Sequence, residues 1–235
     1  NNVKMLQNLD LPNNLELTTG NLDLNGKTLT ISGDIRPNGG SGTIKGSATN
    51  STLKFDDSST PRTLESGDLL NDEIANLTID ESAGVTINTD LTIKENLDIN
   101  AGENFIEGGF VLDIDGATMN VASAADFTFK SNLDASTTPA KTSTAQLAEI
   151  SNTAGTTING DVTVERFIPA GVSANDSRAF RFLSTAVNST GTIRDNWQQG
   201  GLDPGNSGYE PNVGTHITGT DLGTGKGFDD SGSGN

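Results

Sequence analysis

Residues 15–31 contain three short units of one form, in which a polar residue separates two apolar ones: Leu15-Glu16-Leu17, Leu22-Asp23-Leu24 and Leu29-Thr30-Ile31. Successive units begin seven residues apart. Because side chains alternate between the two faces of a β-strand, each unit places both apolar side chains on one face and the polar one on the other. The pattern therefore predicts strands of about three to five residues with one buried face.

The same form returns at intervals of six to eight residues further along the chain: Leu77-Thr78-Ile79, Val85-Thr86-Ile87, Leu91-Thr92-Ile93 and Leu97-Asp98-Ile99. Strands this short bury little surface alone, and they become stable when coils stack and each strand pairs with its counterparts. Two or three strands with their turns give a coil of roughly 20 residues, so we expect about seven or eight coils in residues 1–165. The predicted fold class is all-β, a parallel β-helix or β-solenoid followed by a smaller β-rich C-terminal region.

An internal repeat relates residues 79–93 to residues 150–164 at an offset of 71, with eight of 15 positions identical. This offset is too long for one coil and predicts a higher-order unit of three or four coils. The repeat also bears on Ala145–Glu149, which is helical by propensity. Its counterpart lies beside a predicted strand, so we predict a turn or the entry of a strand there.

The rhythm weakens at residues 34–73 and 122–145, where Gly, Ser, Thr and Asp are frequent, and we expect longer loops between coils there. Past residue 165 the apolar units stop, and aromatic residues and arginines gather. We therefore assign residues 1–165 to the solenoid and residues 166–235 to a separate β-rich or loop-rich region. That region is either a cap over the last coil or the start of a next module. We expect the whole chain to be a processed or truncated piece.

The chain is strongly acidic, with 31 Asp and Glu against 14 Lys and Arg and a net charge of −17. This balance argues against nucleic acid and anionic membrane surfaces as partners. No apolar run is long enough to span a bilayer, so we predict no direct membrane insertion. The acidity serves either solubility or the binding of divalent cations.

For a cation, the candidate ligands are Asp113 and Asp115, which the sequence Asp113-Ile114-Asp115-Gly116 places on one strand face. Calcium takes six to eight oxygen ligands, more than this stretch supplies. We therefore expect no cofactor and keep calcium as the candidate ion.

Two kinds of segment carry a resemblance to a known family. The unit from Asn21 to Ile31 and the stretch from Ala154 to Gly171 resemble coils that recur in very large secreted proteins of the Bacteroidota. In those proteins such coils lead into segments similar to residues 178–184, 195–198, 214–219 and 227–229 of this chain, in that order. The chain thus resembles the repeat-rich, adhesin-like surface proteins of that group.

The resemblance implies export by the type 9 secretion route and an extracellular or cell-surface location. The partners it implies are secretion or outer-membrane components, surface glycans or other cell-surface proteins. It brings no catalytic residues with it.

Polysaccharide hydrolases and lyases also use parallel β-helices, which makes an enzyme the alternative to consider. In sites of the pectin-hydrolase kind, an Asn-Thr-Asp motif is followed along the chain by an Asp-Asp, a Gly-His-Gly and an Arg-Ile-Lys. Paired carboxylates serve there as general acid and base. Here Asn88-Thr89-Asp90 is present, but Asp56-Asp57 precedes it, and the single histidine, His216, lies outside the solenoid. We predict no enzyme and no catalytic residue.

The expected function is structural: a stalk or adhesive segment of a large secreted or cell-surface bacterial protein. The alternative is a carbohydrate-binding or carbohydrate-active β-helix. A third possibility is passive cargo that secretion machinery binds.

Overall fold

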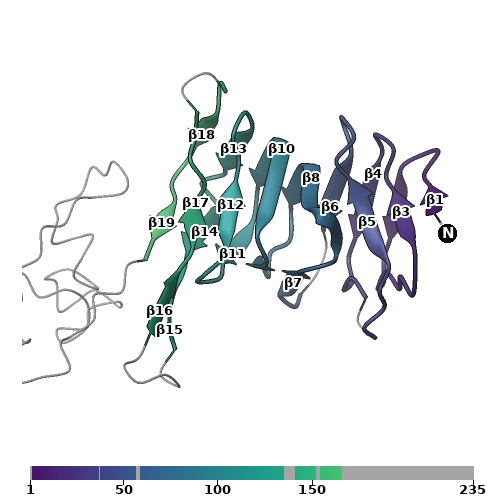
Figure 1. Cartoon of the computed structure of the whole chain (residues 1–235), viewed down its shortest axis with the longest axis horizontal. Helices are drawn as coiled ribbons and strands as arrows, with labels where there is room; N and C mark the ends of the chain where they lie inside the picture. Colours follow the sequence, from purple (N-terminus) through teal and green to yellow (C-terminus); the bar gives the residue numbers. More distant parts are fainter. Residues whose placement is uncertain (1, 37, 57–58, 135–140, 152–153, 166–235) are drawn as a thin grey trace, which may run out of the picture. The chain divides into compact units, whose positions relative to one another are not determined.

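Nineteen β-strands and no helix make up the regular structure of the residues that the computed structural model describes, which are 2–36, 38–56, 59–134, 141–151 and 154–165. Parallel strands from successive turns lie side by side and form a β-solenoid (Figure 1). The predicted all-β solenoid is therefore confirmed. The region predicted beyond residue 165 lies outside the described residues.

Three ladders of parallel strands form three faces of the solenoid. Face 1 consists of β1 (Asn2–Lys4), β3 (Asn21–Asp23), β5 (Thr43–Gly46), the first parts of β8 (Leu69–Ile79) and β10 (Leu91–Ile99), β12 (Val111–Asp113) and β17 (Gln146–Leu147). Face 2 consists of β2 (Leu9–Leu11), β4 (Thr28–Ile31), β6 (Thr52–Phe55), the second parts of β8 and β10, β13 (Thr118–Val121) and β18 (Thr157–Asn159). Face 3 consists of β7 (Arg62–Glu65), β9 (Val85–Asn88), β11 (Gly102–Ile106), β14 (Ala125–Phe129) and β19 (Thr163–Val164).

The described residues form about five complete turns, each with a strand on all three faces, beginning with β5, β8, β10, β12 and β17. The two turns before them have strands on faces 1 and 2 only. In addition, an isolated parallel bridge joins Leu15 of the first of these turns to Ile35 of the second. The complete turns are thus fewer than the seven or eight coils predicted. The predicted coil length agrees better, since Leu77 pairs with Leu97, 20 residues on.

Strands β8 and β10 are longer than the predicted units because each runs from face 1 into face 2. The register between them shifts between Ile93 and Asn96, at the corner of the solenoid. The units predicted at Leu91–Ile93 and Leu97–Ile99 are therefore both extended. They belong to one strand, β10, but lie on two different faces of the solenoid.

Rows of aliphatic side chains run through the interior from turn to turn. On face 2, Leu29, Leu53, Leu77 and Leu97 pair in register, and each is 0% exposed. The intervening residues, such as Thr30, face outward and are half-buried. Burial of apolar surface contributes roughly 25 cal/mol per Å², so these rows are the main source of stability. The predicted alternation is confirmed.

The prediction of longer loops at residues 34–73 is wrong in large part, because β5, β6, β7 and the start of β8 lie in this stretch. At β5 the pattern was hidden because glycine stands in place of an aliphatic residue at Gly46, whereas Leu53-Lys54-Phe55 in β6 has the expected form and was missed. A Cβ at that position would lie 2.0 Å from Ile74 Cδ1, so the isoleucine of the next turn fills the space.

The stretch 122–145 contains both strand and insertion. Strand β14 continues face 3, and then β15 (Ser131–Asp134) and β16 (Lys141–Thr144) form an antiparallel hairpin beside the stack (Figure 1). This insertion lengthens the turn that begins with β12, so that Leu112 pairs with Leu147, 35 residues on. Strand β17 follows directly, which confirms the strand entry predicted at Ala145–Glu149.

The repeat at offset 71 does not mark a unit of three or four turns. On face 3, Ile87 pairs with Ile106, Ile106 with Phe129, and Phe129 with Val164, which is 77 residues from Ile87. The sequence counterpart of Ile87 is Ile158, which lies in β18 on face 2. The prediction of a higher-order unit is wrong, because the same strand–turn–strand pattern is used at two different corners.

Candidate functional site

Asp113 and Asp115, the candidate calcium ligands, lie at the corner between faces 1 and 2. Asp113 ends β12, whereas Asp115 lies in the turn after it, so the prediction that both share one strand face is wrong. Asp113 Oδ1 accepts a hydrogen bond from the Asp115 N–H at 3.0 Å. Asp115 Oδ1 accepts hydrogen bonds from the N–H and the hydroxyl of Ser151, at 2.9 and 3.1 Å. Both carboxylates therefore already bind groups of the protein.

The same corner geometry occurs four turns earlier. There the Asn25 N–H donates to Asp23 Oδ1 at 3.0 Å, as Asp115 does to Asp113. In both corners the next residue, Gly26 or Gly116, has a positive φ and donates its N–H to a hydroxyl of the following turn. A side-chain oxygen that accepts from the backbone two residues on is a standard way to close a turn. The geometry thus gives Asp113 a structural role.

No group of three or more His, Asp or Glu side chains is arranged to hold a metal ion in the described part of the chain. Calcium takes six to eight oxygens, and the corner at Asp113 and Asp115 supplies two carboxylates whose oxygens hydrogen-bond to the turn. The calcium site therefore stays a prediction.

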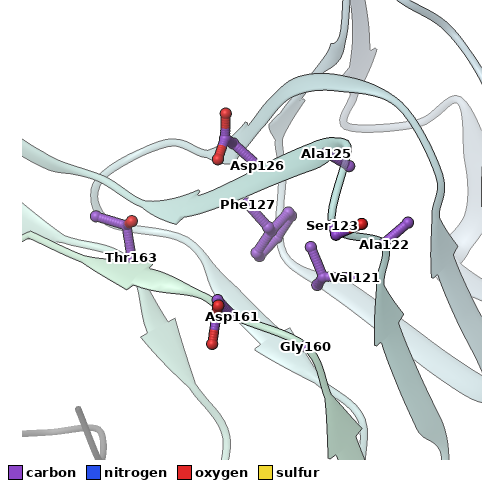
Figure 2. Close-up of a pocket in the computed structure, with 9 residues that line it drawn as sticks. All are labelled: Val121, Ala122, Ser123, Ala125, Asp126, Phe127, Gly160, Asp161 and Thr163. Carbon is purple, nitrogen blue, oxygen red and sulfur yellow. The ribbon is translucent and has the colours of Figure 1, made fainter. Parts of the chain in front are cut away.

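A pocket of about 330 Å³ lies at the corner between faces 2 and 3 of the last two turns (Figure 2). It is lined by Val121, Ala122, Ser123, Ala125, Asp126, Phe127, Gly160, Asp161 and Thr163. Strands β14 and β19 pair at only two positions, whereas β11 and β14 pair at five, so the last turn separates from its neighbour before the corner. This separation leaves the pocket open.

The chemistry of the pocket comes from two carboxylates on different turns. Asp126 lies on β14 and Asp161 lies between β18 and β19 (Figure 2). Phe127 is 1% exposed, so the pocket presents no open aromatic ring. The arrangement offers acceptors for hydroxyl groups of a small polar ligand.

Sequence reasoning missed a buried ion pair beside the corner between faces 3 and 1. Asp68 is 2% exposed, and its Oδ1 accepts a hydrogen bond from Arg36 Nε at 2.8 Å. The Glu65 N–H donates to Asp68 Oδ2 at 2.8 Å. Burial raises the pKa of Asp68, while these donors act in the opposite direction. The two partners are 32 residues apart and belong to no motif, so only the stacking of turns brings them together.

A second charged pair lies at the corner between faces 2 and 3. The side chain of Glu81 is 0% exposed, and its Oε1 lies 3.7 Å from Arg62 Nε. Arg62 also donates to Asp34 Oδ1 at 3.0 Å and to the carbonyl oxygen of Ser32 at 2.6 Å. Arg62 therefore links successive turns.

An asparagine inside the solenoid has a similar structural role. Asn104 is 1% exposed, and its Oδ1 accepts the Val85 N–H at 2.8 Å. Its Nδ2 donates to the carbonyl oxygens of Ala101 and Gly102, at 2.8 and 3.0 Å. Buried amides are stable when they are hydrogen-bonded in this way.

Polar side chains on the outside of face 2 are hydrogen-bonded between turns. Asn96 Nδ2 donates to Asn76 Oδ1 at 2.7 Å. Asn120 Nδ2 donates to Asp98 Oδ1 at 2.7 Å, and Asn159 Nδ2 donates to Asn120 Oδ1 at 2.8 Å. Each amide thus ties its own turn to the preceding one.

Lys54, on the same face, lies between two carboxylates. Its Nζ is 2.8 Å from Asp56 Oδ2 and 2.6 Å from Asp80 Oδ2. Hydrogen bonds to Asp56 and Asp80 raise the pKa of Lys54 above its ordinary value. For Asp80, burial opposes ionisation, but hydrogen bonds from Lys54 and Asn100 outweigh it and lower the pKa of that carboxyl.

The described residues of the hydrolase-like set lie at two different corners, Asp90 between β9 and β10 and Asp56 directly after β6. Asp90 Oδ1 accepts the Val111 N–H of the next turn at 2.8 Å, and Thr89 is buried. Asp56 pairs with Lys54, while Asp57 and His216 lie outside the described residues. The described members of the set therefore have structural partners, and the prediction of no enzyme is left to experiment.

Comparison with protein-family models, with curated proteins and with solved structures gives no match. Among the described residues, no helix has the length and apolar character needed to cross a membrane.

Proposed function

We propose that this chain is a structural segment, a stalk or adhesive spacer, of a large secreted or cell-surface bacterial protein. The observation that supports the proposal is that each turn is fixed to the next both inside and outside. Aliphatic rows fill the interior, and side-chain pairs such as Asn120–Asp98 and Lys45–Asp23 cross between turns on the exterior. A spacer needs this kind of continuity, because load on one turn passes to its neighbours.

Single-molecule force extension of the full chain tests the spacer role. Hydrogen bonds between parallel strands connect one turn to the next, so we expect the turns to be released one after another. A turn of roughly 20 residues adds about 65 Å of extended chain, which sets the expected step. Extension without any measurable resistance would contradict a load-bearing role.

Export by the type 9 route and display at the cell surface form a second part of the proposal, supported by the resemblance of residues 21–31 and 154–171 to coils of Bacteroidota surface proteins. The expected partners are secretion or outer-membrane components and other cell-surface proteins. Fractionation of cells with and without a working type 9 system tests this part. Equal amounts of extracellular protein in both strains would contradict it.

The alternative function is carbohydrate binding or cleavage, which the pocket with Asp126 and Asp161 favours. A glycan array and a polysaccharide-digestion assay, performed on the full chain, separate it from the spacer role. Binding that Asp126→Asn and Asp161→Asn abolish, and that the distant control Asp10→Asn leaves unchanged, would support the carbohydrate function. No signal from the unaltered chain would leave the spacer proposal standing alone.

A further inference from the structure

Three asparagines of the chain are followed directly by glycine: Asn25, Asn38 and Asn159. Asparagine is chemically labile, and its side-chain amide can react with the main-chain nitrogen of the next residue. Glycine favours this reaction because it has no Cβ and rotates freely. The three pairs therefore share one chemistry, and they differ in the freedom that the fold leaves them.

Two of the pairs are packed against a neighbouring turn. A Cβ on Gly26 would lie 3.2 Å from the carbonyl oxygen of Thr49, and the Gly26 N–H donates to the hydroxyl of buried Ser51 at 2.9 Å. A Cβ on Gly160 would lie 2.0 Å from the carbonyl oxygen of Val121. For either glycine nitrogen to rotate onto the asparagine side chain, contacts between two turns have to break first.

The third pair, Asn38 and Gly39, forms the tip of a corner loop. Both residues are exposed, and beyond its two chain neighbours no described atom would lie within 4 Å of a Cβ on Gly39. The Gly39 N–H donates to the Arg36 carbonyl oxygen at 2.9 Å, and Asn38 Nδ2 donates to Glu16 Oε2 at 2.8 Å. Neither accepting residue is buried, so opening these two bonds disturbs no packing between turns.

The loop is anchored on both sides of this tip. The Arg36 N–H donates to the Leu15 carbonyl oxygen at 2.8 Å, and the Gly42 N–H donates to the Leu17 carbonyl oxygen at 3.0 Å. The Arg36 side chain also donates to the carbonyl oxygen of Gly40 at 2.9 Å. A change confined to the tip therefore leaves the strands on either side in place.

We propose that Asn38 is a site of spontaneous deamidation in the folded protein, whereas Asn25 and Asn159 are protected. The Gly39 nitrogen gives its proton to hydroxide and attacks Cγ of Asn38. The Cγ–Nδ2 bond breaks, and Nδ2 takes a proton from water and leaves as ammonia, which closes a five-membered succinimide. Water then opens the ring, to aspartate when it attacks Cγ and to isoaspartate when it attacks the main-chain carbonyl carbon.

Either product has a carboxylate where Asn38 has an amide. The hydrogen bond to Glu16 is lost, and two carboxylates then lie together. Both are exposed, so water and salt weaken their repulsion and the fold is kept. The protein thus ages into a second form that carries an additional negative charge and separates on an anion-exchange column.

Peptide mapping by mass spectrometry, during incubation of the full chain at mildly alkaline pH, tests the proposal. In the folded protein we expect Asn38 to react at least about tenfold faster than Asn25 or Asn159. In urea we expect similar rates at all three sites, because the packing that distinguishes them is gone. Asn38→Gln is the matched control: it keeps an amide but would have to close a larger ring, so the charge variant is expected to disappear.

Three outcomes would overturn the proposal. The first is equal rates at the three asparagines in the folded protein. The second is an unchanged Asn38 in the folded protein after times at which it has reacted in urea. The third is loss of the β-sheet circular dichroism signal in the converted form, which would show that the change is not confined to the loop tip.

Discussion

Ile87→Asp is the substitution that most directly probes the register of the solenoid. Ile87 is 0% exposed and pairs with Leu64 on one side and Ile106 on the other. Removing a buried aliphatic side chain of this size costs about 2–5 kcal/mol. Burial of a carboxylate adds a desolvation cost of several kcal/mol. The sum is comparable with the 5–15 kcal/mol total stability typical of a domain, so we expect the stack to open around face 3.

The neighbouring residue supplies the control for this prediction. Thr86 faces outward between Thr63 and Phe105, and Thr86→Ser is expected to change the free energy of unfolding by no more than about 0.5 kcal/mol. Ile87→Val keeps the site apolar and is expected to cost about 0.5–1.5 kcal/mol. These three variants therefore form a graded series.

Urea and thermal unfolding, followed by far-UV circular dichroism, measure the series. Ile87→Asp is expected to regain part of its stability between pH 7 and pH 4, because burial raises the pKa of the introduced carboxyl and favours its neutral form in the fold. Equal midpoints for Ile87→Asp and Thr86→Ser would refute the assignment of Ile87 to the interior.

Three further substitutions test the contacts between turns. Arg36→Met leaves Asp68 buried without its guanidinium partner and is expected to lower the free energy of unfolding in urea by about 3–5 kcal/mol. Adding Asp68→Asn is expected to restore part of this loss, and an unchanged free energy of unfolding for Arg36→Met would contradict the buried pair. The pKa of Asp80 is lowered in the fold, so its stabilising effect is present above the unfolded pKa of about 3.9 and is lost as pH falls. Lys54→Met is therefore expected to make the fall in stability between pH 5 and pH 3 shallower, by no more than about 1 kcal/mol, and an unchanged slope would contradict the pairing. Gly84→Ala is expected to lower the melting temperature, because φ is +81° and the new Cβ would lie 1.9 Å from a carbonyl oxygen of the next turn; an unchanged melting temperature would contradict that approach.

The strands on the faces of the solenoid could be predicted because their pattern depends only on residues that are neighbours in the sequence. Alternation within units such as Leu29-Thr30-Ile31 follows from the two-residue period of a strand, and it specifies which side chains enter the interior. The parallel stacking of short strands followed from the small area that each one buries alone. The same reasoning failed at Gly46, where the space is filled by Ile74, a residue 28 positions away.

The corners were not predictable because their geometry depends on the next turn. Asp113 and Asp115 have the spacing of two carboxylates on one strand face, but the strand ends at Asp113 and a turn begins. The partner that fixes Asp115 is Ser151, 36 residues further on. The inserted hairpin lies between them, so a regular coil period does not bring them together. A pair of acidic residues in such a chain is therefore poor grounds for a metal site until the turn above it is known.

Inter-turn bonding also restricts where a solenoid of this kind can bind a ligand. On face 2, the side-chain amides of residues such as Asn96 and Asn120 donate hydrogen bonds to the preceding turn. A ligand that approaches this face therefore meets groups that already have partners. Competing for those groups costs the hydrogen bonds that hold the turns together. Recognition is easier where a ladder is interrupted, which happens at the pocket between β14 and β19.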